Sequence, residues 1–427
     1  MSTGTASVEE NRNHWLRQII PMYSGQMVSL LGSSLVQFAL VWWLTRETGS
    51  AVVLATSTFV ALIPNLLLGP FAGALVDRWN RKLVLIVSDA IIALSVGVLG
   101  ILFAFNLQQV WHIYVIIFIR ALGSTFHWPA MSASVSRLVP EKHLSRFAGI
   151  SQAARGSIEI AAPPLGALCM ELLPIYGVIF IDVATAIIAI TVLAFITIPA
   201  VERSDKGMIT PALLLKDVSS GIKFLMSWKG AFSLMIIASM VNFFLIPMDT
   251  LMPLMVTQEL KRGVWELGGL QSAAGVGIIA GGLILGSTGG FKPRILNVIF
   301  GLLGLGTATI IISITPANTI TLAFIGFSML GICLPLANGS LAAIMQASVP
   351  HEMQGRVFSV ISTMAMAVSP IAALMTAPLS MWLGIRNTYL ASGILVIMMG
   401  IVSLLSPAIL GIEKSAKLLK QEATNPL

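Results

Sequence analysis

Long apolar runs separated by short polar loops dominate the chain. A helix needs roughly 20 apolar residues to cross the hydrocarbon core of a bilayer, and runs of this length recur along the whole sequence. The first six predicted spans cover residues 19–45, 51–76, 82–105, 110–136, 145–170 and 174–198. The second six cover residues 230–256, 265–288, 293–314, 318–346, 355–383 and 386–410. The pattern predicts an all-α polytopic membrane protein with 12 transmembrane helices in two six-helix halves.

A polar segment between the two sets of spans divides the chain. Residues 1–198 are expected to form an N-terminal six-helix bundle, and residues 230–427 a C-terminal six-helix bundle followed by a cytoplasmic tail. Residues 199–229 are expected to be a cytoplasmic linker. Apolar and charged residues are mixed between Leu213 and Met226. This mixture fits either an amphipathic helix lying on the membrane surface or a plain connection.

Composition supports a membrane protein and limits the alternatives. Hydrophobic residues make up 56% of the 427 residues and charged residues only 10%, with a mean hydropathy of +0.91. Soluble domains do not have this composition. The net charge of +7 could suggest nucleic acid, but the basic residues lie mostly in alternate loops, beginning with the N-terminal one. The positive-inside rule then places both termini in the cytoplasm, in a multi-pass protein of the cytoplasmic (inner) membrane without a nucleic-acid partner.

Ionisable side chains inside the spans are the main candidates for function, because a charge at bilayer depth costs at least ~2.5 to 3.5 kcal/mol. Arg155 and Glu159 are four residues apart, so they share a helix face and can pair. Glu159 falls near the middle of the membrane, where it could bind and release a proton. A purely structural ion pair and direct contact with a cationic substrate are the alternatives.

The other charged residues of the spans allow more than one role. Asp182 and Asp249 lie about two turns from the outer ends of their spans, where each could serve an outer gate or a proton relay, or cap a neighbouring helix. Asp89 lies near the cytoplasmic surface, where we expect a structural bond to the arginines of the preceding loop. Arg120 requires an acidic partner, such as Asp89, Glu159 or Asp182.

Polar residues of the first span recur at helical spacing. Gln26, Ser33 and Gln37 can lie toward a common face. We expect these three residues, with Asp249, to line a substrate cavity, and helix–helix hydrogen bonding is the alternative for the first span.

The loop between the second and third spans carries the most specific motif of the chain. Its pattern is Gly-x-x-x-Asp-Arg-x-Asn-Arg-Lys, formed by Gly73, Asp77, Arg78, Asn80, Arg81 and Lys82. This motif resembles the signature loop of the major facilitator superfamily, in which a second glycine stands in place of Asn80. The resemblance implies a solute carrier whose two halves rock about a central site. It also implies that Gly73, Asp77, Arg78, Arg81 and Lys82 form a cytoplasmic gate.

The two halves also contain repeated segments, as expected for this superfamily. The same three residues recur 210 positions apart, before the fifth and eleventh spans: Val139, Pro140 and Arg146, then Val349, Pro350 and Arg356. A degenerate copy of the signature loop without the aspartate lies between Gly282 and Arg294. The halves are therefore predicted to be parallel repeats of one six-helix unit.

Further segments resemble the macrolide efflux proteins of this superfamily: Gly25–Leu30, Leu44–Ala51, Phe118–Arg120, Phe126–Ala130 and Gly355–Ser359. Arg120 resembles a fourth-span arginine that is associated with coupling in proton-driven members. The segment Ala162–Ala167 resembles the antiporter motif Gly-Pro-x-x-Gly-Gly. The resemblance implies a proton-coupled antiporter that exports amphipathic drugs such as macrolides by alternating access. Glu159, Arg155, Asp182 and Arg120 are the residues expected to take part in proton coupling, with Glu159 as the first candidate for the proton carrier.

Other function classes are weighed against this one. The same branch is similar to siderophore and lysophospholipid carriers, so an exporter or flippase of such an endogenous compound is the alternative, and a transport-inactive sensor is a third reading. An enzyme is not expected, since His351-Glu352 is followed by Gly355 where a zinc protease has its second histidine. The two cysteines, Cys169 and Cys333, fall in spans of different halves. We expect no catalytic residue, metal or cofactor, and a monomer whose partners are a small amphipathic substrate, protons and the lipid bilayer.

Overall fold

The computed structural model describes residues 4–197, 226, 228–349, 351–413 and 415. Within these ranges the regular structure is helical throughout. Most of the predicted linker, and with it the amphipathic helix expected there, lies outside the described residues. The tail after residue 415 also lies outside them.

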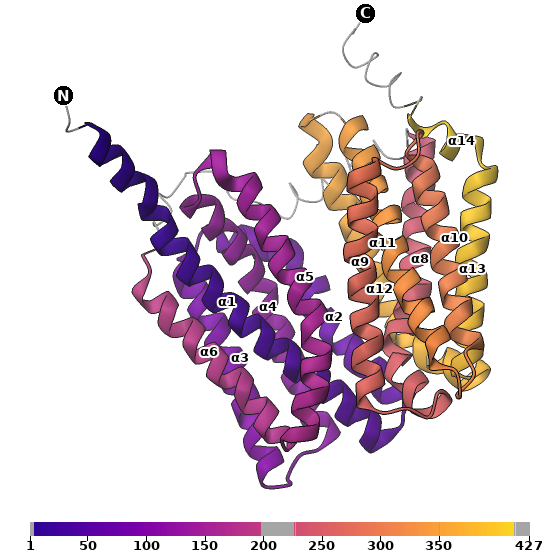
Figure 1. Ribbon diagram of the computed structural model, residues 1–427, viewed down its shortest axis with the longest axis horizontal. Coiled ribbons are helices and arrows are strands. Elements are labelled where there is room, and N and C mark those ends of the chain that lie inside the picture. Colours follow the sequence, from indigo (N-terminus) through magenta and orange to yellow (C-terminus); the bar gives the residue numbers. More distant parts are fainter. Residues whose placement is uncertain (1–3, 198–225, 227, 350, 414, 416–427) are drawn as a thin grey trace, which may run out of the picture. The chain divides into compact units, whose positions relative to one another are not determined.

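Two sets of long helices follow one another along the chain (Figure 1). The first set is α1 (Gly4–Thr48), α2 (Ala51–Val76), α3 (Arg81–Ala104), α4 (Val110–Leu138), α5 (Glu141–Leu172) and α6 (Ile175–Phe195). The second set begins with α8 (Lys229–Leu254), the π-helical turn η1 (Met255–Glu259), α9 (Val264–Thr288) and α10 (Ile295–Ile314). It continues with α11 (Ile320–Ser348), α12 (His351–Leu383), α13 (Ile385–Leu405) and α14 (Pro407–Leu410).

Glycine and proline residues explain where several of these helices begin and end. Gly49 and Gly384 adopt φ angles of 57° and 82°, a backbone region that glycine enters at little cost, and they separate α1 from α2 and α12 from α13. Pro140 and Pro174 directly precede α5 and α6, where a missing N–H is tolerated. The loops are consequently short, and consecutive helices reverse direction.

Ten of the described helices are long and apolar enough to cross a membrane: α1, α2, α3, α4, α6, α8, α9, α10, α11 and α13. The helix α5 has 32 residues but carries charged side chains in its middle. The helix α12 has 33 residues and a shorter apolar part, Ala367–Leu383. The all-α polytopic membrane fold is thus confirmed, and the count of twelve spans stays a prediction.

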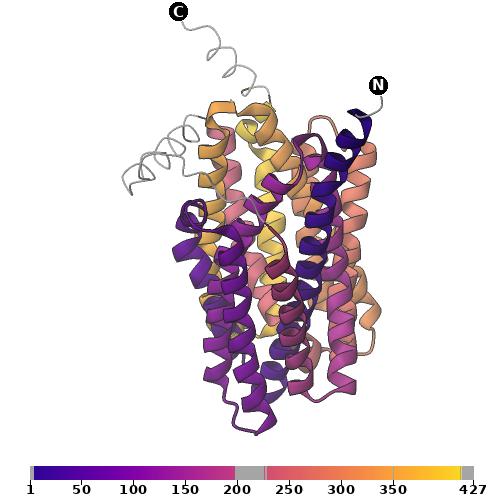
Figure 2. The same ribbon diagram turned by 90° about the vertical axis from the view of Figure 1, so that its left-hand side faces the viewer.

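The chain forms two compact units. Unit 1 comprises Met1–Glu47 and Val60–Gly207, and unit 2 comprises Thr48–Phe59 and Met208–Leu427. The first turns of α2 therefore group with unit 2. Within unit 1, α3 packs on both α4 and α6. Figure 1 labels these helices, and Figure 2 shows the same ribbon turned by 90°.

The packing of α1 against α6 places the polar side chains described below. Gly32 of α1 has no room for a side chain, because an added Cβ atom would overlap the Thr185 hydroxyl and lie 3.1 Å from the Asp182 Cα atom. Farther along α1, Leu35 and Ala39 join Ala162 and Val178 in an apolar cluster. The two backbones therefore lie close together at the level of Asp182.

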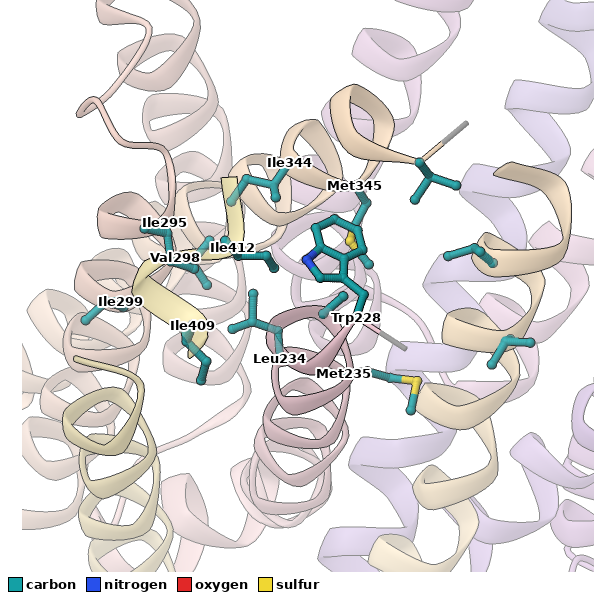
Figure 3. Packing of buried hydrophobic residues seen from close by; sticks show 14 residues of the cluster. Trp228, Leu234, Met235, Ile295, Val298, Ile299, Ile344, Met345, Ile409 and Ile412 are labelled. Atoms are coloured by element: carbon teal, nitrogen blue, oxygen red, sulfur yellow. The ribbon is translucent and has the colours of Figure 1, made fainter. Parts of the chain in front are cut away.

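Unit 2 is held together by a larger apolar cluster around Trp228, whose exposed fraction is 2% (Figure 3). The indole lies at the start of α8, among side chains from α8, α10, α11, α12, α14 and the segment that follows α14. Those labelled in the figure are Leu234, Met235, Ile295, Val298, Ile299, Ile344, Met345, Ile409 and Ile412. Burial of these side chains fixes the end of α8 that follows the linker.

The two repeated Val-Pro segments occupy equivalent structural positions. Val139 ends α4 and Val349 ends α11, and in each case the valine N–H donates to the carbonyl four residues earlier, at 2.9 Å. Both valines are buried. The two valines of the repeat therefore end corresponding helices, α4 and α11.

Candidate functional site

A buried ion pair joins α4 to α6 inside unit 1. The Arg120 Nη1 atom lies 3.8 Å from Asp182 Oδ2, and the two side chains are 12% and 1% exposed. Ser33 of α1 completes the group, which we call the Asp182 cluster. The Ser33 hydroxyl donates to Asp182 Oδ1 at 2.9 Å, and Arg120 Nη2 donates to the Ser33 carbonyl at 2.8 Å. Three helices are thus joined by one carboxylate and one guanidinium.

The Asp182 cluster balances its charges but not all of its hydrogen bonds. Asp182 is the only charged residue of α6, and Arg120 provides the acidic residue with a counterion at bilayer depth. The Arg120 Nη1 and Asp182 Oδ2 atoms, which face each other, lack hydrogen-bond partners among the described residues. A buried pair with unmet hydrogen bonds is less stable than a fully bonded one. This ion pair can therefore be opened more easily than an ideal bidentate pair.

A second buried polar group lies on the same helices. Gln26 Nε2 of α1 donates to Asp89 Oδ2 of α3 at 2.8 Å. His127 Nε2 of α4 lies 3.2 Å from Asp89 Oδ1 and 2.9 Å from Gln26 Oε1. We call these three residues the Asp89 cluster. Gln26 and Asp89 are buried, at 4% and 6% exposed.

The two clusters share a common architecture. Ser33 follows Gln26 by seven residues on α1, and Arg120 precedes His127 by seven residues on α4. Seven residues make about two helical turns, or about 10 Å along the axis, so each pair lies on one face of its helix. Each cluster therefore takes one residue from α1 and one from α4, and its carboxylate from a third helix. That third helix is α3 for Asp89 and α6 for Asp182.

Two polar residues of the first span contact other helices. Gln26 and Ser33 were expected in a cavity wall, with helix–helix hydrogen bonding as the alternative, and both form hydrogen bonds to other helices, while Gln26 is buried. The physical reason is that buried carboxylates on α3 and α6 need donors within reach. Gln37 is exposed, and its contribution to a substrate cavity stays a prediction.

The ion pair that Arg155 and Glu159 could form is not present among the described residues. The Arg155 guanidinium instead lies over the ring of Trp128, 3.5 Å from its centroid. A cation stacked on an indole face is attracted by the ring quadrupole. The side chain of Glu159 is exposed. The two members of the pair are thus available for different roles.

Asp249 lies on α8 of unit 2, and its side chain is exposed. The preceding residue, Met248, is buried, and its carbonyl accepts a hydrogen bond from the Tyr389 hydroxyl of α13 at 2.5 Å. That bond fixes the α8 backbone next to Asp249. No ion pair or hydrogen bond of the Asp249 carboxylate is found among the described residues. A carboxylate so placed can attract a cationic group or a proton.

The signature loop is anchored by its basic residues. The Arg81 Nη1 atom donates to the Ala133 carbonyl of α4 at 2.9 Å, and its Nη2 atom lies 3.3 Å from Asp77 Oδ1. Lys82 Nζ donates to the Ala194 carbonyl at the end of α6, at 2.8 Å. Asp89 was expected to bond this loop and instead bonds Gln26 and His127. Asp89 follows Arg81 by eight residues on α3, about 12 Å along the helix axis, so it lies nearer to Gln26 and His127 than to the loop.

The remaining loop residues are open to solvent, and Asn80 explains the departure from the motif. The Asn80 side chain caps α3 by accepting a hydrogen bond from the Leu83 N–H at 3.2 Å. Asp77 and Arg78 are exposed, and an added Cβ atom on Gly73 would meet nothing within 4 Å. Asparagine thus replaces the motif glycine with a residue that stabilises the start of α3.

His127 and Trp128 are functional candidates that sequence reasoning missed. His127 was noticed only as part of a family-like segment, although its spacing of seven residues from Arg120 matches that of Gln26 and Ser33 on α1. That matching spacing was the available signal. Trp128 gave none, because its contact depends on how α4 and α5 pack.

Comparison with known proteins identifies the family. Residues 22–373 match the model of the Major Facilitator Superfamily. The chain is 30% identical to macrolide efflux protein A of Streptococcus pyogenes, over 92% of this chain and 96% of that protein. It is 23% identical to the multidrug efflux pump Tap of Mycolicibacterium fortuitum, over 90% and 95% of the two chains.

A solved structure supports the same fold. The crystal structure of the nucleoside transporter NupG matches with a TM-score of 0.69 at 12% identity, covering 88% of this chain and 98% of that chain. At such low identity this likeness concerns the fold alone. The helical architecture, the signature loop and the sequence match over 92% of the chain agree: the chain is a membrane transporter that belongs to the Major Facilitator Superfamily.

Proposed function

We propose that this protein exports amphipathic drugs such as macrolides across the cytoplasmic membrane, by alternating access and in exchange for protons. The observation that carries the proposal is the 30% identity to macrolide efflux protein A over nearly the full length of both chains. Similarity to the pump Tap extends the expected substrates to other drugs. Many macrolides carry an amine on a large apolar ring, so they need an apolar surface with few charges.

The charges within the spans support coupling to protons. Protonation of Asp182 would neutralise it while Arg120 keeps its charge, since a guanidinium does not lose its proton in proteins. The pair at 3.8 Å would then separate, and the guanidinium would keep its bond to the Ser33 carbonyl. Glu159, exposed on α5, is the second proposed proton carrier. Arg155 would act on Glu159 or on substrate after leaving the ring of Trp128.

Substrate contact is assigned to exposed polar residues. Gln37 on α1 and Asp249 on α8 are both exposed. The Asp249 carboxylate provides an anion for a cationic amine, and Gln37 provides a donor and an acceptor for hydroxyl or ester groups. Gln26 and Ser33 act indirectly, through the carboxylates that they bond.

Membrane orientation and gating complete the proposal. The basic loops place both termini on the cytoplasmic side by the positive-inside rule. The signature loop then lies on that side, and Asp77, with 69% of its side chain exposed, serves with Gly73, Arg78, Arg81 and Lys82 as the cytoplasmic gate. The transporter is proposed to work as a monomer.

The test is drug accumulation in a bacterial host that lacks its own drug pumps. Cells producing the protein should hold several-fold less radiolabelled erythromycin than control cells, and a protonophore should restore the control level. Asp182→Asn, produced in equal amount, should abolish the difference. Unchanged accumulation of every macrolide tested, from a correctly inserted protein, would contradict the proposal. Movement of a labelled siderophore or lysophospholipid instead would establish the alternative substrate class.

A further inference from the structure

We propose that Asp89, His127 and Gln26 form a proton-binding site distinct from the Asp182 cluster, in which His127 gains and loses the proton. This inference rests on the proposed proton-coupled export, because it names a site for the coupled ion. The site is built from three helices of unit 1, namely α1, α3 and α4. The basic partner of Asp89 is a histidine, whereas that of Asp182 is an arginine. Histidine is the side-chain type suited to binding and releasing a proton under physiological conditions.

The hydrogen bonds determine which ring nitrogen takes part. An ionised carboxylate only accepts, so the Gln26 amide directs its nitrogen to Asp89, at 2.8 Å, and its oxygen to His127. His127 Nε2 then faces two acceptors, Gln26 Oε1 at 2.9 Å and Asp89 Oδ1 at 3.2 Å. A ring nitrogen between two acceptors must carry hydrogen. The proton is therefore gained and lost at Nδ1, while Nε2 stays protonated.

A proton placed on Asp89 would not fit this arrangement. It would point a carboxyl O–H toward His127 and require Nε2 to accept, and Nε2 would then present a lone pair to the Gln26 carbonyl oxygen 2.9 Å away. Two facing lone pairs repel each other and leave a buried acceptor unsatisfied. Gln26 thus selects the protonated form of Nε2 and assigns the titration to the imidazole.

The proton on His127 neutralises the buried charge of Asp89, and this neutralisation favours the folded protein. With a neutral imidazole, the cluster holds the charge of Asp89, whose side chain is 7% exposed. With an imidazolium, the cluster becomes a neutral ion pair, which removes the cost of an uncompensated charge at that depth. His127 is 20% exposed, so it can exchange a proton more readily than the carboxylate. Release of the proton would weaken the attraction between α4 and α3.

Other charged groups on the surrounding helices already have their own partners or lie toward solvent. The helix α2 contains no ionisable side chain, and the only charged residue of α6, Asp182, pairs with Arg120. From α5, Arg155 is held on the ring of Trp128, the residue that follows His127, and its positive charge opposes the imidazolium. Glu159 of α5 is exposed.

The other ionisable groups near the site act at a distance or are bonded elsewhere. The Tyr23 hydroxyl of α1 donates to the Ser151 carbonyl at 3.1 Å. The remaining charged residues of α1, α3, α4 and α5 lie nearer to the ends of those helices. Asp89 is therefore the anion that sets the charge of His127, and it is the residue to change in a test.

The direct test follows the imidazole by nitrogen NMR. Protein labelled with ¹⁵N-histidine is reconstituted in lipid nanodiscs, and the His127 signal is assigned by its absence in His127→Gln. We expect the ring to change reversibly from an imidazolium at low pH to a neutral ring protonated at Nε2 at high pH. In Asp89→Asn a smaller fraction of the rings should carry the second proton at a given pH, because the neutral amide no longer attracts the imidazolium. A ring that does not titrate, a neutral ring protonated at Nδ1, or a transition unaffected in Asp89→Asn would overturn the site.

The coupling test measures proton exchange on drug binding, in weakly buffered detergent solution with a pH dye. Addition of erythromycin to the wild-type protein should move protons, and His127→Gln should reduce that signal by at least half. His112→Gln is the matched control, because His112 lies on the same helix and bonds the Gln109 N–H at its start. An unchanged signal in His127→Gln would overturn this site and leave drug–proton coupling intact. Failure of the wild-type protein to bind any drug would contradict the proposed function, and the NMR titration would still decide the site.

Discussion

Asp182→Asn removes one charge from the buried ion pair and changes little else. Asparagine has nearly the same shape, and its side-chain oxygen can still accept the hydrogen bond from Ser33 at 2.9 Å. Arg120, with 12% of its side chain exposed, would keep the Ser33 carbonyl but lose its only ion-pair partner among the described residues. The substitution therefore isolates the cost of an unpaired guanidinium within the membrane.

The structure gives an approximate size for that cost. Removal of one partner from a buried ion pair costs about 3 to 5 kcal/mol. The distance of 3.8 Å and the absence of a direct hydrogen bond between Arg120 Nη1 and Asp182 Oδ2 place this pair at or below the lower end. We expect Asp182→Asn to lower the free energy of unfolding by about 2 to 3 kcal/mol. Ser33→Ala, which removes one hydrogen bond, should cost about 1 kcal/mol.

A double-mutant cycle measures the interaction itself. Unfolding by SDS in mixed micelles is followed for the wild type, Asp182→Asn, Arg120→Gln and the double variant. Each single variant leaves a buried charge unpaired, whereas the double variant leaves none. The double variant should therefore be more stable than the sum of the single costs predicts, by about 2 kcal/mol. Additive costs would refute the reasoning, because they would mean that the two charges do not stabilise each other in the folded protein.

Three further predictions concern local contacts. Gly32→Ala should lower the thermal stability in detergent, since its methyl group would overlap α6, whereas Gly156→Ala, with nothing within 4 Å, should be neutral or slightly stabilising. Asn80→Ala should cost about 1 kcal/mol in SDS unfolding by removing the α3 cap, and Asn80→Asp should not. Arg155→Gln and Trp128→Leu should each cost about 0.5 to 2 kcal/mol in SDS unfolding, and together less than the sum of the two, because both remove the same cation–π contact.

The fold could be predicted because local features of the sequence specify the helices and where they end. Apolar runs of bilayer length specify spanning helices, and the Val-Pro repeat marks corresponding helix ends at Val139 and Val349. The helix α5 illustrates the limit of hydropathy. Its charged residues remove the apolar signal, although the helix, at 32 residues, is longer than α4 and α6.

The sequence predicted which residues belong to the candidate site better than it predicted which partners those residues contact. The cost of buried charge correctly singled out Arg120 and Asp182 as residues that need compensation. Helical spacing also allowed Arg155 to reach Glu159, but spacing within one helix could not reveal that Trp128 on α4 would be the nearer partner. The bond between Gln26 and Asp89 likewise depends on which helices are neighbours, which no local pattern specifies.

The most direct measurement of the central claim uses purified protein in liposomes that enclose a pH dye. With an imposed proton gradient, erythromycin, other amphipathic drugs, a siderophore and lysophospholipids are added one at a time. The account predicts that a macrolide or another amphipathic drug triggers proton movement, and that the signal is lost in Asp182→Asn and reduced in Glu159→Gln. Transport of a compound without any proton movement would contradict proton-coupled drug export.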